Sequence, residues 1–245
     1  MIEIDLIVES LNELCRFNRT LFKETVSEQT ICASLSQCIL LVKREKYPRF
    51  NDYYVDVEYN RGYSGKKKAV QMFDNQTKEY RLKNVICDLV IHKRGEGGAT
   101  PENLIAIEMK KTSDCEKKVS NKTESEYFNN RREADIARLI ALTNNKNVQN
   151  GYGTFSLDVD KKDQSYFVEG FQLGVFIELC DKEEGTECPE SGWRKTSINK
   201  LKIRFFINGQ ERTEYNVSFV FNKDSLILSA IFLISFSFIF LYKVF

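Results

Sequence analysis

Two apolar stretches near the middle of the chain carry charged residues that such stretches seldom contain. Stretch 85–92 includes Asp88, and stretch 104–110 includes Glu108 and Lys110. Burial of an unpaired carboxylate is expensive, so acids inside apolar strands indicate a special role. Because side chains alternate between the two faces of a strand, Glu108 and Lys110 share one face. If the two strands are neighbours, two carboxylates and one ammonium converge at one edge of a sheet.

This convergence suits metal-assisted hydrolysis. Two carboxylates form an oxygen-rich site for Mg²⁺, and we expect Mn²⁺ to substitute. We expect Asp88 and Glu108 to bind the metal, with the backbone carbonyl of Met109 as an extra ligand. Lys110 would then orient or activate the attacking water, or offset charge that develops on a phosphate. The simpler alternative is an exposed Asp at a sheet edge and an ordinary Glu–Lys ion pair at a strand end.

Periodicity predicts the elements that must position these residues. Residues 6–46 carry apolar side chains at spacings of three and four, which predicts a helix in two pieces that Pro48 ends. Residues 53–59 alternate as a strand does, and 62–83 are expected to form a loop on the substrate side. The remaining predicted elements are strands 85–92 and 104–110, a helix from about 124 to 142, strands 152–157 and 170–180, and a hairpin of 201–207 with 215–221 that turns near Asn208-Gly209.

The motif and the order of the elements resemble the PD-(D/E)xK nuclease superfamily. Asp88, a glycine-rich turn at 95–98 and the pair Glu108-x-Lys110 carry the resemblance. Cys87 stands where the motif that names the superfamily has proline. A Glu-x-Lys pair alone occurs by chance in most proteins, so the signal comes from both halves lying on consecutive apolar strands.

The resemblance covers residues 28–143, in which segments 55–61 and 92–94 are similar to recurring parts of bacterial restriction and defence nucleases. It implies an α/β fold with a restriction-endonuclease-like αβββαβ core and a mixed central sheet. That core would span about 28–180 of a domain formed by 1–222. The resemblance also implies hydrolysis of phosphodiester bonds, with DNA a more frequent substrate than RNA.

Three further charged residues have two interpretations each. Glu28 begins the predicted helix before the sheet, where an acid is favoured by the helix dipole, and the resemblance implies that it adds to the metal site. Asp135 and Arg138 are three residues apart on a predicted helix, as in similar proteins. An ordinary ion pair on the helix surface explains their spacing as well.

Basic side chains and the single histidine supply candidates for substrate binding. Clustered lysines are usually a solvated surface, but a phosphate backbone requires a local basic face of this kind. His92 shares the face of Asp88 and could contact phosphate, although a lone histidine more often completes a hydrogen-bond network. The candidates are Lys66, Lys67, Lys68, Lys111 and His92.

The composition bounds the remaining classes. The chain has 245 residues, 42% of them hydrophobic, which is enough for a packed core. Lys and Arg number 36 and Asp and Glu 35, so the net charge of +1 neither supports nor excludes a polyanionic partner. Seven cysteines without metal-ligand spacing and one histidine argue against a zinc site. The first residues lack the basic region of a signal peptide, and we expect free cysteines in a reducing cytosol.

The tail, residues 225–242, contains no charged residue. As a helix it would span roughly 27 Å, close to the hydrocarbon thickness of a bilayer. It is apolar all round, which predicts a single-pass C-terminal transmembrane anchor that leaves the preceding domain in the cytoplasm. The alternative is a buried helix or a pair of strands in the core.

Together these observations predict a Mg²⁺-dependent endonuclease tethered to a membrane. Its expected partners are nucleic acid, the membrane through 225–242, and a second copy of the chain in a homodimer. One alternative is a catalytically inactive module of the same fold that binds nucleic acid or a protein at the membrane. Another is a fragment whose hydrophobic tail packs inside a larger assembly.

Overall fold

The computed structural model describes residues 1–23, 26–58, 67–74, 79–94, 100–112, 122–144, 153–157, 165–167, 170–180 and 200–220. The helices are α1 (Ile2–Phe17), α2 (Arg19–Lys23), α3 (Glu28–Lys46) and α4 (Lys122–Thr143), with 3₁₀ turns at Pro48–Phe50 and Thr213–Tyr215. The strands are β1 (Tyr54–Val57), β2 (Lys67–Asp74), β3 (Glu79–Asn84), β4 (Leu89–His92), β5 (Asn103–Thr112), β6 (Gly153–Leu157), β7 (Ser165–Phe167), β8 (Leu173–Cys180), β9 (Lys200–Ile207), β10 (Gln210–Glu211) and β11 (Val217–Val220).

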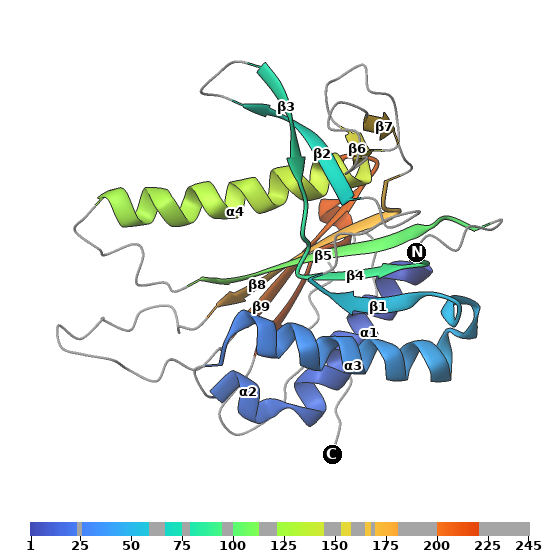
Figure 1. Cartoon of the computed structure of the whole chain (residues 1–245). Coiled ribbons are helices and arrows are strands. Elements are labelled where there is room, and N and C mark those ends of the chain that lie inside the picture. Colours follow the sequence, from blue (N-terminus) through green and yellow to red (C-terminus); the bar gives the residue numbers. More distant parts are fainter. Residues whose placement is uncertain are drawn as a thin grey trace.

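Within these ranges, seven strands form a central mixed sheet in the order β1-β4-β5-β8-β9-β10, with β11 also paired to β9. The pairs β1–β4, β4–β5 and β8–β9 are antiparallel, whereas β5 and β8 are parallel. A parallel pair needs a long crossover, and α4 lies in the connection from β5 to β8. Helices α1 and α3 cover one face of the sheet and α4 the other (Figure 1).

A second sheet of four strands, β3-β2-β6-β7, lies beside α4 (Figure 1). Strands β2 and β3 come between β1 and β4 in the chain. The expected loop at 62–83 is therefore wrong for most of its length. Strand β3 alternates charged with uncharged residues, and β2 begins with two lysines and has a glutamine within its apolar residues, so the stretch showed no clear hydrophobic period.

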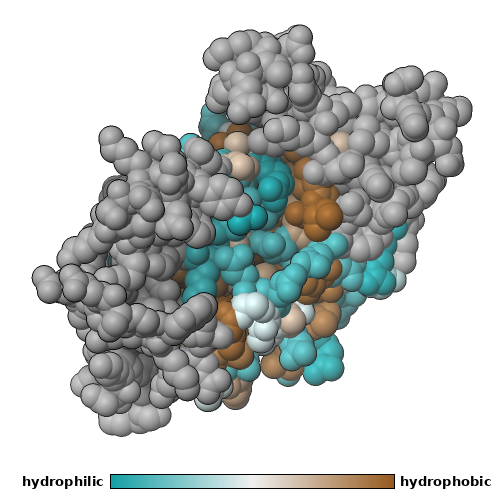
Figure 2. Space-filling view, turned by 60° about the vertical axis from the view of Figure 1, so that its left-hand side comes forward, coloured by the Kyte–Doolittle hydropathy of each residue, from teal (hydrophilic) through white to brown (hydrophobic). Residues whose placement is uncertain are grey.

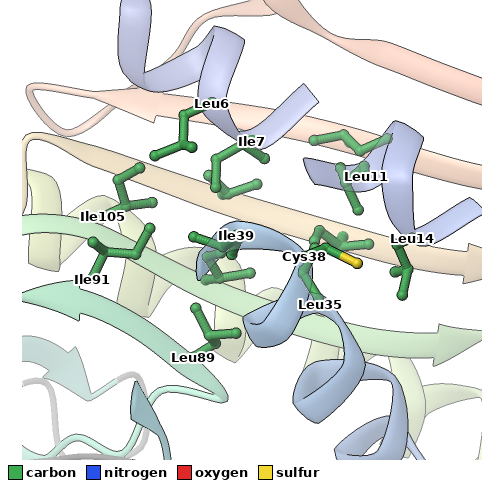
Figure 3. Close-up of a cluster of buried hydrophobic side chains, with 14 of the residues drawn as sticks. Leu6, Ile7, Leu11, Leu14, Leu35, Cys38, Ile39, Leu89, Ile91 and Ile105 are labelled. Atoms are coloured by element: carbon green, nitrogen blue, oxygen red, sulfur yellow. The ribbon is translucent and has the colours of Figure 1, made fainter. Parts of the chain in front are cut away.

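The apolar stripes of α1 and α3 pack against one face of the central sheet. Buried residues recur along α3 at helical spacing, and Ser27 caps the helix by accepting a hydrogen bond from the Thr30 N–H at 3.2 Å. Figure 3 shows this cluster between the helices and the strands. Its members include Leu6, Ile7, Leu11, Leu14, Leu35, Ile39, Leu89, Ile91 and Ile105.

The opposite face of the sheet packs against α4. Val90 and Ala106 belong to the cluster that contains Leu139 and Leu142 of the helix, together with Phe176 of β8. Leu89 and Ile105 belong to the first cluster, so successive residues of β4 and β5 alternate between the two faces as expected. The hairpin turn was also predicted correctly, since Asn208 and Gly209 both have positive φ, as a type I′ turn requires.

The predicted fold class, an αβββαβ core followed by a transmembrane helix, is wrong. The structure is a mixed α/β fold with a seven-stranded mixed sheet and a second sheet, whose strands come from two places in the chain, β2 and β3 after β1 and β6 and β7 after α4. In the described part of the chain, no helix combines the length and apolar character needed to cross a bilayer. Residues 225–242 lie outside that part. Length and hydropathy alone had suggested the anchor, and an apolar run of this kind also suits other buried elements.

Candidate functional site

Asp88, Glu108 and Lys110 converge at the end of the central sheet where β5 finishes. Asp88 lies at the bend before β4 and not inside a strand, as had been expected. Its Oδ2 accepts a hydrogen bond from the backbone N–H of Met109 at 2.6 Å. Glu108 and Lys110 follow Ala106 on the face of β5 that packs against α4.

Glu108 is a buried acid held by an arginine of the crossover helix. The residue is 2% exposed, and its Oε1 accepts a hydrogen bond from Nη1 of Arg138 at 2.6 Å. Arg138 Nη2 also donates to Oδ1 of Asp135 at 3.1 Å. The opposite oxygen of Asp135, Oδ2, lies 3.4 Å from Nζ of Lys110.

Helix α3 brings a fourth carboxylate to the same place. Glu28 occupies the first turn of α3, and its Oε1 accepts a hydrogen bond from the N–H of Lys111 at 2.6 Å. Its Oε2 lies 3.8 Å from Nζ of Lys110. The start of α3 is thereby tied to the end of β5. Figure 2, in which this end of the molecule comes forward, shows a band of hydrophilic side chains.

Burial controls the ionisation of both motif carboxylates. Burial raises the pKa of Asp88, and the negative charges of Glu28 and Asp135 raise it further. The hydrogen bond from the Met109 N–H and the positive charge of Lys110 act in the opposite direction. For Glu108, burial raises the pKa to about 8, because Arg138 offsets only part of the cost and the neighbouring Asp88 and Asp135 add to it. Both carboxyl groups therefore hold a proton more tightly than an exposed carboxyl does, and a bound cation would have to displace it.

The backbone of Met109 lies on the side of β5 that faces Asp88. The backbone pairing of β4 with β5 ends at Leu89 and Ile107. Beyond this pair, the N–H of Met109 donates to the side chain of Asp88 instead of to a backbone carbonyl of β4. In a strand the N–H and C=O of one residue point to the same side, so the Met109 carbonyl also lies on the Asp88 side of β5.

The oxygen donors at this site fit one hard divalent cation that takes only a few of its ligands from the protein. Within the described residues, no group of three or more His, Cys, Asp or Glu side chains is arranged to hold a metal. Mg²⁺ commonly uses only one or two carboxylates, with waters and substrate oxygens completing its shell. Asp88 Oδ1 and Glu108 Oε2, the oxygens not engaged by Met109 and Arg138, could serve in this way.

His92 lies away from this cluster, at the other end of β4. It is fully buried, its Nδ1 accepts from the Arg94 N–H at 3.3 Å, and its Nε2 lies 2.9 Å from Oδ2 of Asp56. Since Nδ1 accepts, Nε2 is the nitrogen that donates to Asp56. Four residues of extended chain separate His92 from Asp88, about 13 Å, so the structure does not bring the two together.

The lysine candidates are only partly described. Lys66 lies outside the described residues, and Lys67 and Lys68 begin β2 opposite Leu157 and Ser156 of β6. Lys111 follows Lys110 on β5, so its side chain points to the opposite face of the sheet. Its backbone N–H, which binds Glu28, is its one contribution to the site among the described contacts.

One pair of residues at the site, and one buried acid beside the site, were not selected from the sequence. Asp135 and Arg138 were singled out for a spacing that similar proteins share and that an ordinary ion pair also explains, but they were not chosen as site residues. Glu178 was missed altogether. It is 6% exposed in the apolar strand β8, opposite Lys110 in the register, and Arg132 Nη2 donates to it at 3.1 Å. An acid in an apolar strand was the signal that had identified Glu108.

Comparison with protein-family models, with curated proteins and with solved structures gave no match for this chain.

Proposed function

We propose that the chain is a metal-dependent nuclease that hydrolyses phosphodiester bonds, with DNA as its substrate class. The observation that carries the proposal is the convergence of Asp88, Glu108 and Lys110 at one end of the central sheet. The resemblance of these residues to the PD-(D/E)xK motif supports it further. Two carboxylates and a lysine brought together at one end of a sheet are more than a binding surface for nucleic acid needs.

The residues divide the chemical work as follows. Asp88 and Glu108 offer carboxylate oxygens to a divalent ion, and the Met109 carbonyl lies on the same side of β5. The bound ion supplies Lewis-acid polarisation and lowers the pKa of a water. The Lys110 ammonium, placed beside Glu28 and Asp135, orients that water or offsets the charge that develops on the phosphate.

A second candidate is a binding module of the same fold that does not cleave. The engagement of Glu108 by Arg138 favours it, because a guanidinium already neutralises the acid that would hold the metal. Such a module would bind nucleic acid or a protein partner without requiring Lys110. Binding of DNA without cleavage in any divalent ion would support this candidate against the nuclease.

Cleavage by the purified full chain is expected to depend on Mg²⁺ or Mn²⁺. Excess EDTA should abolish it, and Ca²⁺ should support binding but only poor cleavage, since oxygen ligands favour hard cations but geometry decides catalysis. The measurement follows degradation of labelled single-stranded and double-stranded DNA, with RNA of the same sequence in parallel. Full activity in EDTA would contradict the metal mechanism, and preferential cleavage of RNA would contradict the substrate class.

The lysines at the start of β2 are expected to contact phosphates. The triple substitution Lys66→Glu/Lys67→Glu/Lys68→Glu should weaken DNA binding and reduce the slope of log affinity against log salt by up to about 3, near 0.9 for each lost contact. The measurement is binding anisotropy over a salt series in Ca²⁺. Arg44→Glu, at the far end of α3, serves as a charge-reversal control. An unchanged slope in the triple variant would remove this segment from the interface.

A further inference from the structure

The crossover helix α4 places one anion and one cation against the motif residues. Arg138 contacts Glu108, Asp135 contacts Lys110, and the two α4 residues contact each other. We propose that Asp135 and Arg138 are positioning residues, through which α4 fixes the Lys110 ammonium and the Glu108 carboxylate in their reactive orientation. This inference rests on the proposed nuclease function and deepens it.

The contact of Arg138 fixes the direction of the Glu108 carboxylate. Guanidinium is a planar fork whose donors have fixed geometry, and here one arm donates to Glu108 and the other to Asp135. Since Oε1 of Glu108 is held at 2.6 Å, rotation of the carboxylate is restricted and the position of Oε2 is set. Without this partner the carboxylate would be free to rotate, and burial would raise its pKa further.

Asp135 does the corresponding work for Lys110. A lysine has a flexible four-carbon stem, so its ammonium occupies a defined position only where acceptors hold it. Asp135 Oδ2 lies 3.4 Å from Nζ, nearer than Glu28 Oε2 at 3.8 Å. The side chain of Asp135 is 12% exposed, which limits screening of this attraction by water.

The competing interpretation is a structural ion pair that merely joins the helix to the sheet. The same helix offers a matched control for it: Arg132 donates to the buried acid Glu178 at 3.1 Å. This pair also joins α4 to the sheet, but within the described part of the chain its arginine forms no ion pair with Glu108 and no hydrogen bond with Lys110. A structural role would make both arginines equally important for folding and equally unimportant for turnover.

Steady-state cleavage in Mg²⁺ separates these interpretations. Arg138→Met and Asp135→Asn are each expected to lower kcat by about 10²-fold with KM nearly unchanged, the cost of a misplacement near 1 Å. Arg138→Lys should recover part of the loss, since it keeps the charge but not the fork. Arg132→Met should keep wild-type kcat. Equal kcat in Arg138→Met and Arg132→Met would overturn the inference.

A second readout does not depend on cleavage. Free energies of unfolding in EDTA are measured for Arg138→Met, Glu108→Gln and their combination, and likewise for Asp135→Asn with Lys110→Met. The effects are expected to be non-additive in both cycles, because each pair is in contact. Additive effects would overturn the inference even if the wild type cleaves DNA. Non-additive effects in a chain that cleaves no nucleic acid would support the positioning contacts and overturn the nuclease proposal.

Discussion

Asp88→Asn, Glu108→Gln and Lys110→Met are each expected to lower Mg²⁺-dependent cleavage by more than about 10²-fold. Mutation of a group that merely orients a metal ligand already costs up to about 10²-fold, and these three residues have direct roles in the proposed site. The two amides keep the shape of the carboxylates but lose the charge that binds the cation. Methionine keeps the stem of Lys110 and loses the ammonium that offsets developing charge. The measurement is kcat and KM on labelled DNA, with circular dichroism to confirm that each variant is folded.

A matched control comes from the adjacent strand. Glu178→Gln removes a buried acid opposite Lys110 in the β5–β8 register, yet Glu178 binds Arg132 and is not part of the proposed metal site. Its turnover should stay near that of the wild type. If Glu178→Gln is as impaired as Glu108→Gln, loss of any buried charge explains the defect. If one of the three motif variants keeps wild-type turnover, that residue has no catalytic role.

Strand periodicity was sufficient to place the motif. Because side chains alternate with a period of two, the spacing of Glu108 and Lys110 puts them on one face whatever the surrounding fold. The apolar neighbours of Glu108 and Lys110 identified β5. The apolar stretch around Asp88 identified the adjacent strand. The sequence did not indicate that Asp88 precedes β4. Its position at the bend depends on where pairing with β1 begins, at Val57 and Leu89.

The contribution of α4 could not be derived from local pattern. Which charged residues of a helix face a sheet depends on how that helix crosses it, and α4 shows many polar residues around its axis. Arg138 and Asp135 therefore looked like a surface ion pair. In the fold, Leu139 and Leu142 pack against the sheet and carry Arg138 and Asp135 to the end of β5.

His92 shows the limit of reasoning from one face. Sequence alternation puts it on the face of Asp88, but distance along β4 separates the two. Its ring is occupied by Asp56 and by the backbone of Arg94. Two residues of a strand belong to one site only if they share a face and also lie close together. The period of two gives the shared face but not the distance.

The metal-free protein is expected to lose stability as the pH rises through the range in which Glu108 ionises. The folded-state pKa of Glu108 is about 8, against an ordinary value of 4.5, so the fold binds this proton more tightly than the unfolded chain does. The stabilisation is fully present below pH 4.5 and is lost as the pH rises to about 8. One pKa unit corresponds to about 1.4 kcal/mol, so the full loss is on the order of 5 kcal/mol.

Glu108→Gln tests this directly, because glutamine resembles the protonated acid and does not titrate. Urea unfolding in EDTA should give similar stability for wild type and variant near pH 4. Above pH 8 the variant should be the more stable of the two, although it is inactive. Such an exchange of stability for function is common at catalytic sites. Arg138 stays charged throughout, so any pH-dependent difference between the two curves comes from the titration of Glu108. Parallel stability curves between pH 4 and 9 would show that the pKa of Glu108 is the same in the folded and the unfolded protein, with Arg138 compensating its burial in full.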